Sequence, residues 1–196
     1  MKKIVSVMLA LFLALGVCGA FAESAALPAY TYGGDDPIWS AVVKYMQETD
    51  FGYETPEGGV LVPTPIILKT EVNEDETEAT VYGNFWIFTY ALEGRTLVTG
   101  PCGENPGVLK LEKKDGVWAV TAAEFAGDGE DYLADIAKFA NGDEALEQDY
   151  FLAGGADGES MLPQYQRAAL VEYVNGNNLD ITEYKDYGQN PVSLTD

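Results

Sequence analysis

The sequence predicts an α+β fold in which a helix packs on a curved antiparallel sheet of four or more strands, with further helices towards the C-terminus. Three observations support this prediction. Segments between residues 60 and 125 are rich in the β-branched and aromatic residues typical of strands. Apolar residues recur at helical spacing over 37–48 and again after residue 126. An Asp-Gly pair at 115–116 separates two strand-like segments, which is a strong hairpin signal.

The first predicted helix covers residues 37–48. Asp36 precedes it with a side chain suited to the N-cap, and Pro37 is favourable at the first helical position because its fixed φ matches the helix. The apolar residues that follow share one face, so this face is expected to lie on the sheet. They are Ile38, Trp39, Val42, Val43, Tyr45 and Met46.

The next segment, 60–72, has extended character but contains two prolines. Pro63 and Pro65 cannot donate to a strand ladder, so we expect the first half at an edge or bulge and the regular strand over 66–72. The acidic segment 73–78 (NEDETE) then turns the chain. Because it lacks the glycine usual in calcium-binding loops, it is interpreted as a solvated turn rather than a calcium site.

The long segment 79–92 is the predicted central strand. Both sets of its alternate positions are largely apolar, so the strand is expected to be covered on both faces, or to line a cavity on one of them. Gly83 predicts a bulge or bend within it. Segments 95–101, 107–114 and 117–125 are expected to complete an antiparallel meander.

Helices are expected to dominate the rest of the chain. Helical spacing of apolar residues predicts helices over 130–140 and 162–174, with a short helix over 143–151 between them. The tail after residue 178 is short and aromatic. It is predicted to form either a last edge strand or a segment strapped across the body.

The N-terminus has the pattern of an export signal. Lys2 and Lys3 precede an apolar stretch over 4–17, and an Ala-Phe-Ala sequence ends at Ala22. Cleavage after Ala22 predicts a secreted or cell-envelope-associated protein. Two alternatives are an uncleaved anchor and a lipoprotein modified at Cys18.

The predicted organisation is therefore a signal peptide at 1–22, a flexible leader at 23–35 and a single α+β domain at 36–196. Within this domain, 36–140 is expected to form a cone-like core and 141–196 a helical C-terminal extension. Since the sequence shows no internal repeat and no low-complexity linker, no second domain is expected.

Composition excludes several classes of function. The formal net charge of −21 repels nucleic acid phosphates and anionic membrane surfaces, so neither is expected as a partner. The chain has no histidine, which excludes His-dependent nucleophilic catalysis and His-ligated zinc. Cys102 is the single cysteine outside the signal region and lies in a turn-like sequence, so it is interpreted as structural or incidental. We expect no cofactor and no metal.

Three of these segments together resemble a known fold family. The leading helix with Trp39, the long bent strand 79–92 and the hairpin VLKLEKKDGVWAVTAAEF are similar to the nuclear-transport-factor-two-like, cystatin-like α+β cone. The region over 103–139 also resembles uncharacterised exported proteins of Gram-positive gut bacteria. The resemblance implies a pocket between the helix and the concave face of the sheet. Enzymes of that superfamily tend to use Asp, His or Tyr in the cone, but no such catalytic residue matches a position here.

The favoured hypothesis is an exported, non-catalytic binding or interaction domain for a small molecule, a peptide or an envelope protein. One alternative is a His-free isomerase, dehydratase or hydrolase that uses a carboxylate and a tyrosine in the cone. Another is a purely structural envelope protein. A homodimer formed through the sheet is also consistent with the aromatic strand.

Aromatic side chains on the long strand and its neighbours are the predicted ligand-binding residues. Their rings supply apolar area and their polar tips can orient a ligand. The alternative is that these rings form the core, or that a bulge at Gly83 inverts which positions face the helix. The predicted residues are Tyr45, Tyr82, Trp86, Phe88, Tyr90 and Trp118.

Overall fold

The computed structural model describes residues 26–154 and 160–195. This part of the chain has an α+β fold, with four helices and one seven-stranded mixed sheet that does not close into a barrel. The predicted fold class is therefore confirmed. The expected signal peptide, its cleavage position and Cys18 lie outside the described residues. Within these residues, no helix is long and apolar enough to cross a membrane.

The first helix and the strands follow the predicted order. The elements are α1 (Pro37–Glu48), β1 (Val60–Val72), β2 (Glu78–Glu93), β3 (Thr96–Gly103), β4 (Pro106–Lys114), β5 (Val117–Phe125), α2 (Tyr132–Ala140), α3 (Glu144–Ala153), α4 (Leu162–Gly176), β6 (Glu183–Lys185) and β7 (Val192–Ser193). The bounds of α1 coincide with the prediction, because Asp36 accepts hydrogen bonds from the backbone N–H groups of Ile38 and Trp39 and caps the helix.

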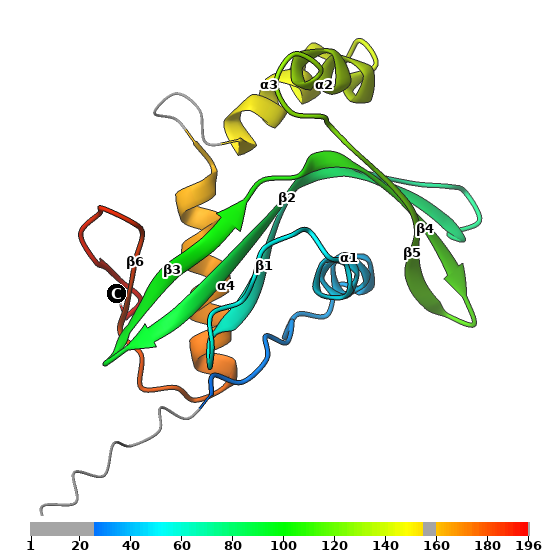
Figure 1. Cartoon of the computed structure of the whole chain (residues 1–196). Coiled ribbons are helices and arrows are strands. Elements are labelled where there is room, and N and C mark those ends of the chain that lie inside the picture. The colour runs from blue at the N-terminus through cyan, green and yellow to red at the C-terminus, as the bar shows by residue number, and fades with distance from the viewer. Residues whose placement is uncertain (1–25, 155–159, 196) are drawn as a thin grey trace, which may run out of the picture.

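The sheet is built around β2, but it is not the simple meander that was expected. Strand β2 pairs with β1 along one side and with both β3 and β4 along the other. The pairs Ile87 with Gly103 and Asn84 with Pro106 keep the same register, so β3 and β4 act as one long partner strand interrupted at 104–105. Figure 1 shows the resulting arch, with α1 beneath it and α2 and α3 above it.

Two glycines mark the bend of this arch. Gly83 and Gly107 are cross-strand partners on β2 and β4. A Cβ atom on Gly83 would lie 2.6 Å from the carbonyl oxygen of Ile66, so the backbones approach too closely for a larger residue. The bulge expected at Gly83 is found in the opposite strand instead, where the register shifts between Ile67 and Lys69.

Strand β1 is regular from its first residue, which corrects the expectation that the regular strand begins at residue 66 and confirms the expected edge position. It pairs with β2 from Val60 onwards, including Pro63 and Pro65. Among the described strands its single partner is β2, so β1 is an edge strand. Prolines are tolerated there because an edge strand has one side that needs no ladder donor.

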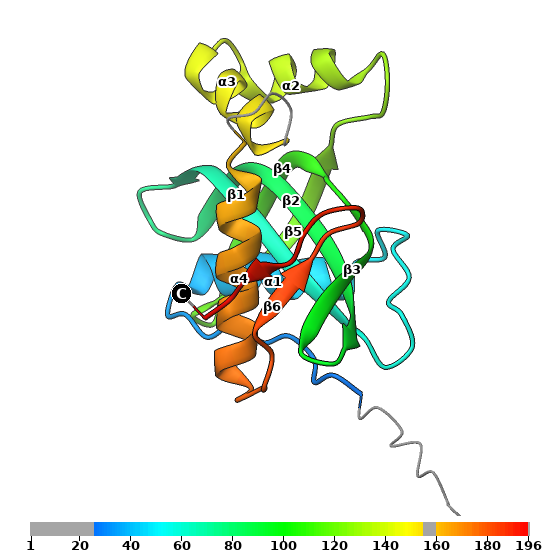
Figure 2. The same cartoon turned by 90° about the vertical axis from the view of Figure 1, so that its left-hand side faces the viewer.

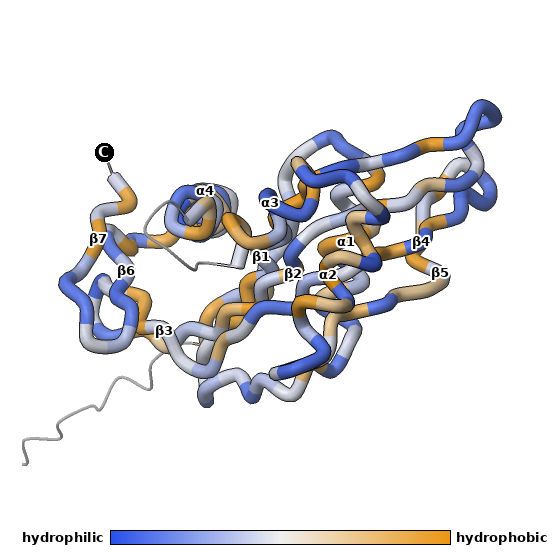
Figure 3. The backbone as a smooth tube through the Cα atoms, turned by 90° about the horizontal axis from the view of Figure 1, so that it is seen from above, coloured by the Kyte–Doolittle hydropathy of each residue, from blue (hydrophilic) through white to orange (hydrophobic). Residues whose placement is uncertain are grey.

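Helices cover both faces of the sheet. Helix α1 packs on the face of β2 that carries Val81, Phe85 and Ile87. Helices α2 and α3 cover the opposite face near Tyr82, and α4 covers that face further along β2, near Phe88. Figure 2 shows α4 in front of the sheet. In Figure 3, hydrophobic and hydrophilic stretches alternate along β4 and β5, which agrees with their mixed burial.

The segment 26–35, expected to be a flexible leader, is packed against the domain in the structure. Leu27 and Tyr30 are buried in the core cluster beneath α4. The backbone N–H of Leu27 donates to Gly58, and the hydroxyl of Tyr173 donates to the carbonyl of Pro28 at 2.8 Å. The burial of Leu27 and Tyr30 explains why this short segment is ordered, because it offsets the conformational entropy that the segment loses.

The C-terminal region is also different from a purely helical extension. After α4, strand β6 joins the sheet beside β3 in parallel, and β7 pairs with β6. Of the two alternatives expected for the tail, the edge strand is therefore the one found. Because β6 follows α4 and runs parallel to β3, the sheet is mixed rather than wholly antiparallel.

Candidate functional site

Three of the predicted ligand-binding residues form a stack on the face turned away from α1. The rings of Trp86 and Phe88 lie 5.6 Å apart, and those of Phe88 and Tyr90 lie 6.1 Å apart. Tyr90 is fully buried, and its hydroxyl accepts a hydrogen bond from Gln166 of α4 at 3.0 Å. The indole N–H of Trp86 donates to the carbonyl of Ala153 at 2.9 Å. This stack therefore belongs to the packing between the sheet and the C-terminal helices.

The other three predicted residues lie elsewhere. Tyr82 packs near α2 and α3, and its hydroxyl donates to Glu71 at 3.2 Å. Tyr45 and Trp118 meet in a groove of about 370 Å³ between α1 and β5. The six side chains therefore lie in three separate places and do not line a single pocket. The reason is that Val81, Phe85 and Ile87 face α1, so the aromatic positions of β2 face the opposite side.

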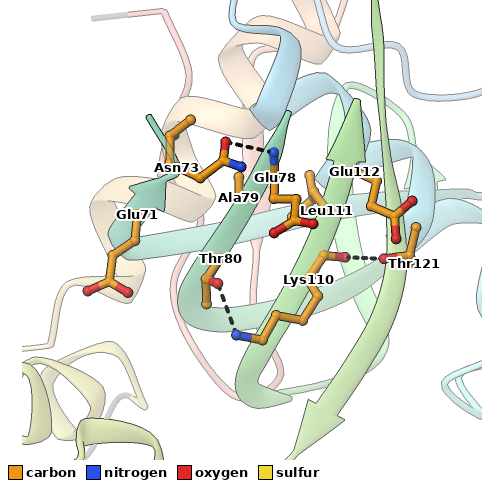
Figure 4. A pocket seen from close by; sticks show the side chains of 10 residues that line it. Glu71, Asn73, Glu78, Ala79, Thr80, Lys110, Leu111, Glu112 and Thr121 are labelled. Atoms are coloured by element: carbon orange, nitrogen blue, oxygen red, sulfur yellow. Dashed lines mark hydrogen bonds between the residues drawn. The ribbon is translucent and has the colours of Figure 1, made fainter. Parts of the chain in front are cut away.

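A depression of about 550 Å³ lies between the end of β1, the start of β2 and the neighbouring strands β4 and β5 (Figure 4). Lys110 donates to Thr80 at 3.0 Å, and the amide oxygen of Asn73 accepts from the backbone of Glu78 at 3.0 Å. Its carboxylates are solvent-accessible, and no group of three His, Cys, Asp or Glu residues in the described ranges is arranged to hold a metal ion. The depression is therefore a hydrated part of the acidic surface.

A smaller groove has the character of a ligand site. It occupies about 250 Å³ beside the edge strand β1, between α1 on one side and α4 on the other. We call it the aromatic groove. It is lined by Tyr30, Tyr32, Trp39, Pro63, Thr64, Pro65, Tyr165, Ala168, Ala169 and Glu172.

The aromatic wall of this groove is held from several directions. The rings of Tyr32 and Trp39 stack with centroids 6.1 Å apart, and the capped start of α1 positions Trp39. Tyr165 lies opposite on α4. All three of these side chains are half-buried, so each ring keeps an accessible part. Such partly exposed rings are typical of small-molecule sites.

A carboxylate is fixed at the edge of the groove. Glu172 accepts a hydrogen bond from the hydroxyl of Tyr30 at 3.1 Å and another from the backbone N–H of Gly33 at 2.5 Å. Burial raises the pKa of Tyr30, and the nearby Glu172 raises it further, so this hydroxyl stays protonated and keeps donating at neutral pH. The side chain of Glu172 is thereby held in one place before any ligand arrives.

A buried polar atom in the same groove lacks a partner. The hydroxyl oxygen of Thr64 has no hydrogen-bond partner within the described residues, although Thr64 is only 2% exposed. Burying an unpaired hydroxyl costs about 1–3 kcal/mol. Unpaired groups of this kind are uncommon, and this oxygen has essentially no accessible surface, so the unpaired hydroxyl bears on the stability of the fold.

A second polar cluster lies at the bend of the arch. The side-chain amide of Asn84, which is fully buried, donates to Glu104 at 2.8 Å, and its oxygen accepts from the backbone of Asn105 at 3.1 Å. Burial raises the pKa of Glu104. Burial also raises the pKa of Tyr132, and the nearby Glu104 carboxylate raises it further. Burial also raises the pKa of the Cys102 thiol, which disfavours a reactive thiolate.

The variant Glu104→Gln is expected to be more stable than the wild type at pH 7. Because burial raises the pKa of Glu104, ionisation disfavours the folded state, and this penalty is fully present above the folded-state pKa. Glutamine keeps an oxygen that accepts from Asn84 but does not ionise. We expect a Tm about 1–2 °C higher at pH 7, with the difference disappearing as the pH falls towards the ordinary value of 4.5.

Thermal unfolding between pH 4 and pH 8 measures this effect. The exposed Glu57 offers a control, because Glu57→Gln removes one negative charge without altering a buried group. An equal gain in both variants would show that the overall acidic charge, rather than the burial of Glu104, is responsible.

No protein-family model, curated protein or solved structure matches this chain. The site must therefore be judged on its geometry. Sequence reasoning singled out Trp39 and the two prolines but did not bring them together, and it missed Tyr32, Thr64, Tyr165 and Glu172. The prolines were the available signal, since they mark an exposed strand edge that other segments must cover.

Proposed function

We propose that the protein is an exported, non-catalytic binding domain that holds a small ligand in the aromatic groove. The observation that carries this proposal is a groove lined by half-buried rings, with the carboxylate of Glu172 fixed at its edge by two hydrogen bonds. Export is supported by the charged, apolar and Ala-Phe-Ala pattern at 1–22.

The cone resemblance is part of the same proposal. A helix beneath a bent sheet and the hairpin of β4 and β5 support a nuclear-transport-factor-two-like or cystatin-like architecture. In such a fold the expected pocket lies under the arch. Here that space is occupied by Met46, Phe85 and Leu109, which are fully buried, so the ligand site is proposed at the edge of β1 instead.

A His-free enzyme is the second candidate, because Glu104 combines partial burial with a raised pKa. The end of α3 covers this carboxylate. A Cβ atom on Gly154 would lie 2.9 Å from its Oε2 atom. A substrate would have to displace α3, so the binding function is favoured.

Thr64→Val is expected to raise the free energy of unfolding by about 1 kcal/mol, because it replaces a buried, unpaired hydroxyl with a methyl group. Thr89→Val is the matched control. Thr89 is also fully buried, but its hydroxyl donates to the carbonyl of Pro101 at 2.7 Å, so its removal should lower stability by about 1–2 kcal/mol. Urea unfolding followed by circular dichroism measures both. A loss of stability in both variants would contradict an unpaired hydroxyl at Thr64.

The binding function is tested by NMR titration of the isotope-labelled chain without residues 1–22. The probes are small organic cations, neutral monosaccharides and proline-containing dipeptides. At least one class is expected to shift the indole N–H of Trp39 and the amide of Thr64. Trp39→Leu should abolish the response, whereas Tyr187→Ala, at an exposed aromatic outside the groove, should keep it.

Two outcomes would overturn the proposal. One is the absence of shifts in the groove with every probe class. The other is a binding response that Trp39→Leu leaves at full strength, since the ligand would then lie elsewhere on the domain.

A further inference from the structure

The charge of the aromatic groove indicates the class of its ligand. Glu172 is the one carboxylate in the lining, and no lysine or arginine is among the lining residues that the structure describes. Nor does any ion pair formed within 26–154 and 160–195 involve Glu172. The chain as a whole carries a net charge of −21, which acts in the same sense as Glu172. An anionic ligand is therefore disfavoured, and a cationic one is attracted.

The aromatic rings of the groove also favour a cationic ligand. The faces of Trp39, Tyr32 and Tyr165 carry the negative part of the aromatic quadrupole, which attracts a cation placed over them. An alkylated ammonium group suits such a wall because its methyl groups contact the rings and it has few or no N–H groups to satisfy.

The volume of the groove limits the size of the ligand. The groove occupies about 250 Å³, which is below the range of about 300–1,000 Å³ typical of drug-sized ligands. It is open along the edge of β1 rather than enclosed by the core. A compact cation of a few heavy atoms fits these dimensions.

We infer that the aromatic groove binds a small organic cation carrying an alkylated ammonium group, with the cation over Trp39, Tyr32 and Tyr165 and its charge balanced by Glu172. This inference rests on the proposed binding function and adds the class of ligand. It assigns Glu172 the role of selecting charge, because its two hydrogen bonds fix the carboxylate beside the rings.

The experiment compares choline with 3,3-dimethyl-1-butanol, which has the same shape but carries carbon in place of the charged nitrogen. Calorimetric titration of the chain without residues 1–22 should show choline binding at least ten-fold more tightly than the neutral compound, as expected for a partly desolvated cation over aromatic rings. Tetramethylammonium should also bind. Indole N–H shifts place the response at Trp39.

The matched variant is Glu172→Gln, which keeps an oxygen that accepts from Tyr30 or Gly33 but removes the charge. This variant should weaken choline binding about five- to ten-fold, while the affinity for the neutral compound should stay unchanged. If this variant unfolds, Tyr165→Leu provides a second test, because Tyr165 is half-buried on the surface of α4. Tyr165→Leu should weaken choline binding while the thermal transition stays close to that of the wild type.

The outcomes separate this inference from the proposed function. Equal affinity for choline and the neutral compound would overturn charge selection but leave a binding groove. Binding of a sugar or dipeptide at Trp39 with no response to choline would have the same meaning. The absence of any response at Trp39 to every probe would overturn both.

Discussion

Asn84→Ala is expected to lower the free energy of unfolding by about 2–4 kcal/mol. Asn84 is 0% exposed and spans the interruption between β3 and β4, where its amide group donates to Glu104 and accepts from the backbone of Asn105. Alanine removes both hydrogen bonds and leaves these partners unpaired in a half-buried place. The loss is large because both hydrogen bonds lie at the interruption between β3 and β4, where Asn84 and Asn105 together replace the regular ladder. Urea unfolding followed by circular dichroism measures it.

Asn73→Ala is the matched control for this prediction. Asn73 also accepts two backbone hydrogen bonds, from Thr77 and Glu78, but it lies in an exposed turn where water can replace them. Its loss is expected to stay near 1 kcal/mol or below. Equal losses in the two variants would show that burial at the bend is not what makes Asn84 important.

Gly107→Ala is expected to destabilise the fold by about 1–3 kcal/mol through overpacking. The added Cβ atom would lie 2.3 Å from the carbonyl oxygen of Glu124 and 2.7 Å from the ring of Phe125. The first of these is a backbone atom of β5, so relief requires the hairpin of β4 and β5 to shift. The carbonyl of Gly107 also accepts a hydrogen bond from the buried hydroxyl of Tyr150 at 2.8 Å, so a shift would disturb the packing of α3 as well.

The control for Gly107 is Gly176, the last residue of α4. A Cβ atom there meets nothing within 4 Å, so Gly176→Ala should be neutral or stabilise the chain by up to about 1 kcal/mol. Thermal and urea unfolding of the two variants measure the contrast. A Gly107→Ala variant as stable as the wild type would show that β4 and β5 separate at little cost, contrary to the close contact at the bend.

The proposed ligand site has a simple electrostatic basis. A chain with a net charge of −21 attracts cations over its whole surface, but diffuse attraction between exposed charges is screened by salt. The aromatic groove adds ring faces and a fixed carboxylate at one place. Discrimination between a cation and its neutral analogue is therefore the property that separates a specific site from a generally acidic surface.

Local signals in the sequence were sufficient for the elements themselves. The bounds of α1 follow from the cap formed by Asp36 and the proline beside it, which act within one helical turn. The hairpin between β4 and β5 follows from Asp115 and Gly116, which both adopt positive φ angles. These features depend on neighbouring residues, so they are recognisable without knowledge of the rest of the chain.

The sequence could not decide which face of β2 meets α1. Both sets of alternate positions are apolar. The two-residue period of a strand therefore does not show which face contacts α1 and which contacts the other helices. The structure places Val81, Phe85 and Ile87 against α1 because they complete its core cluster, and the larger rings are covered by α4 and its neighbours. The predicted site residues were dispersed for this reason.

The aromatic groove likewise depends on tertiary structure. Its walls come from segments 30–39, 63–65 and 165–172, which are far apart in the chain and share no sequence motif. Tyr30 and Tyr32 belong to a segment whose composition suggests a loose leader, yet the burial of Leu27 and Tyr30 beneath α4 orders it. Composition and periodicity thus determined the α+β elements and the acidic character of this protein, because both are properties of short segments. Packing between distant segments decided the site, since the free edge of β1 becomes a groove only where α1 and α4 border it.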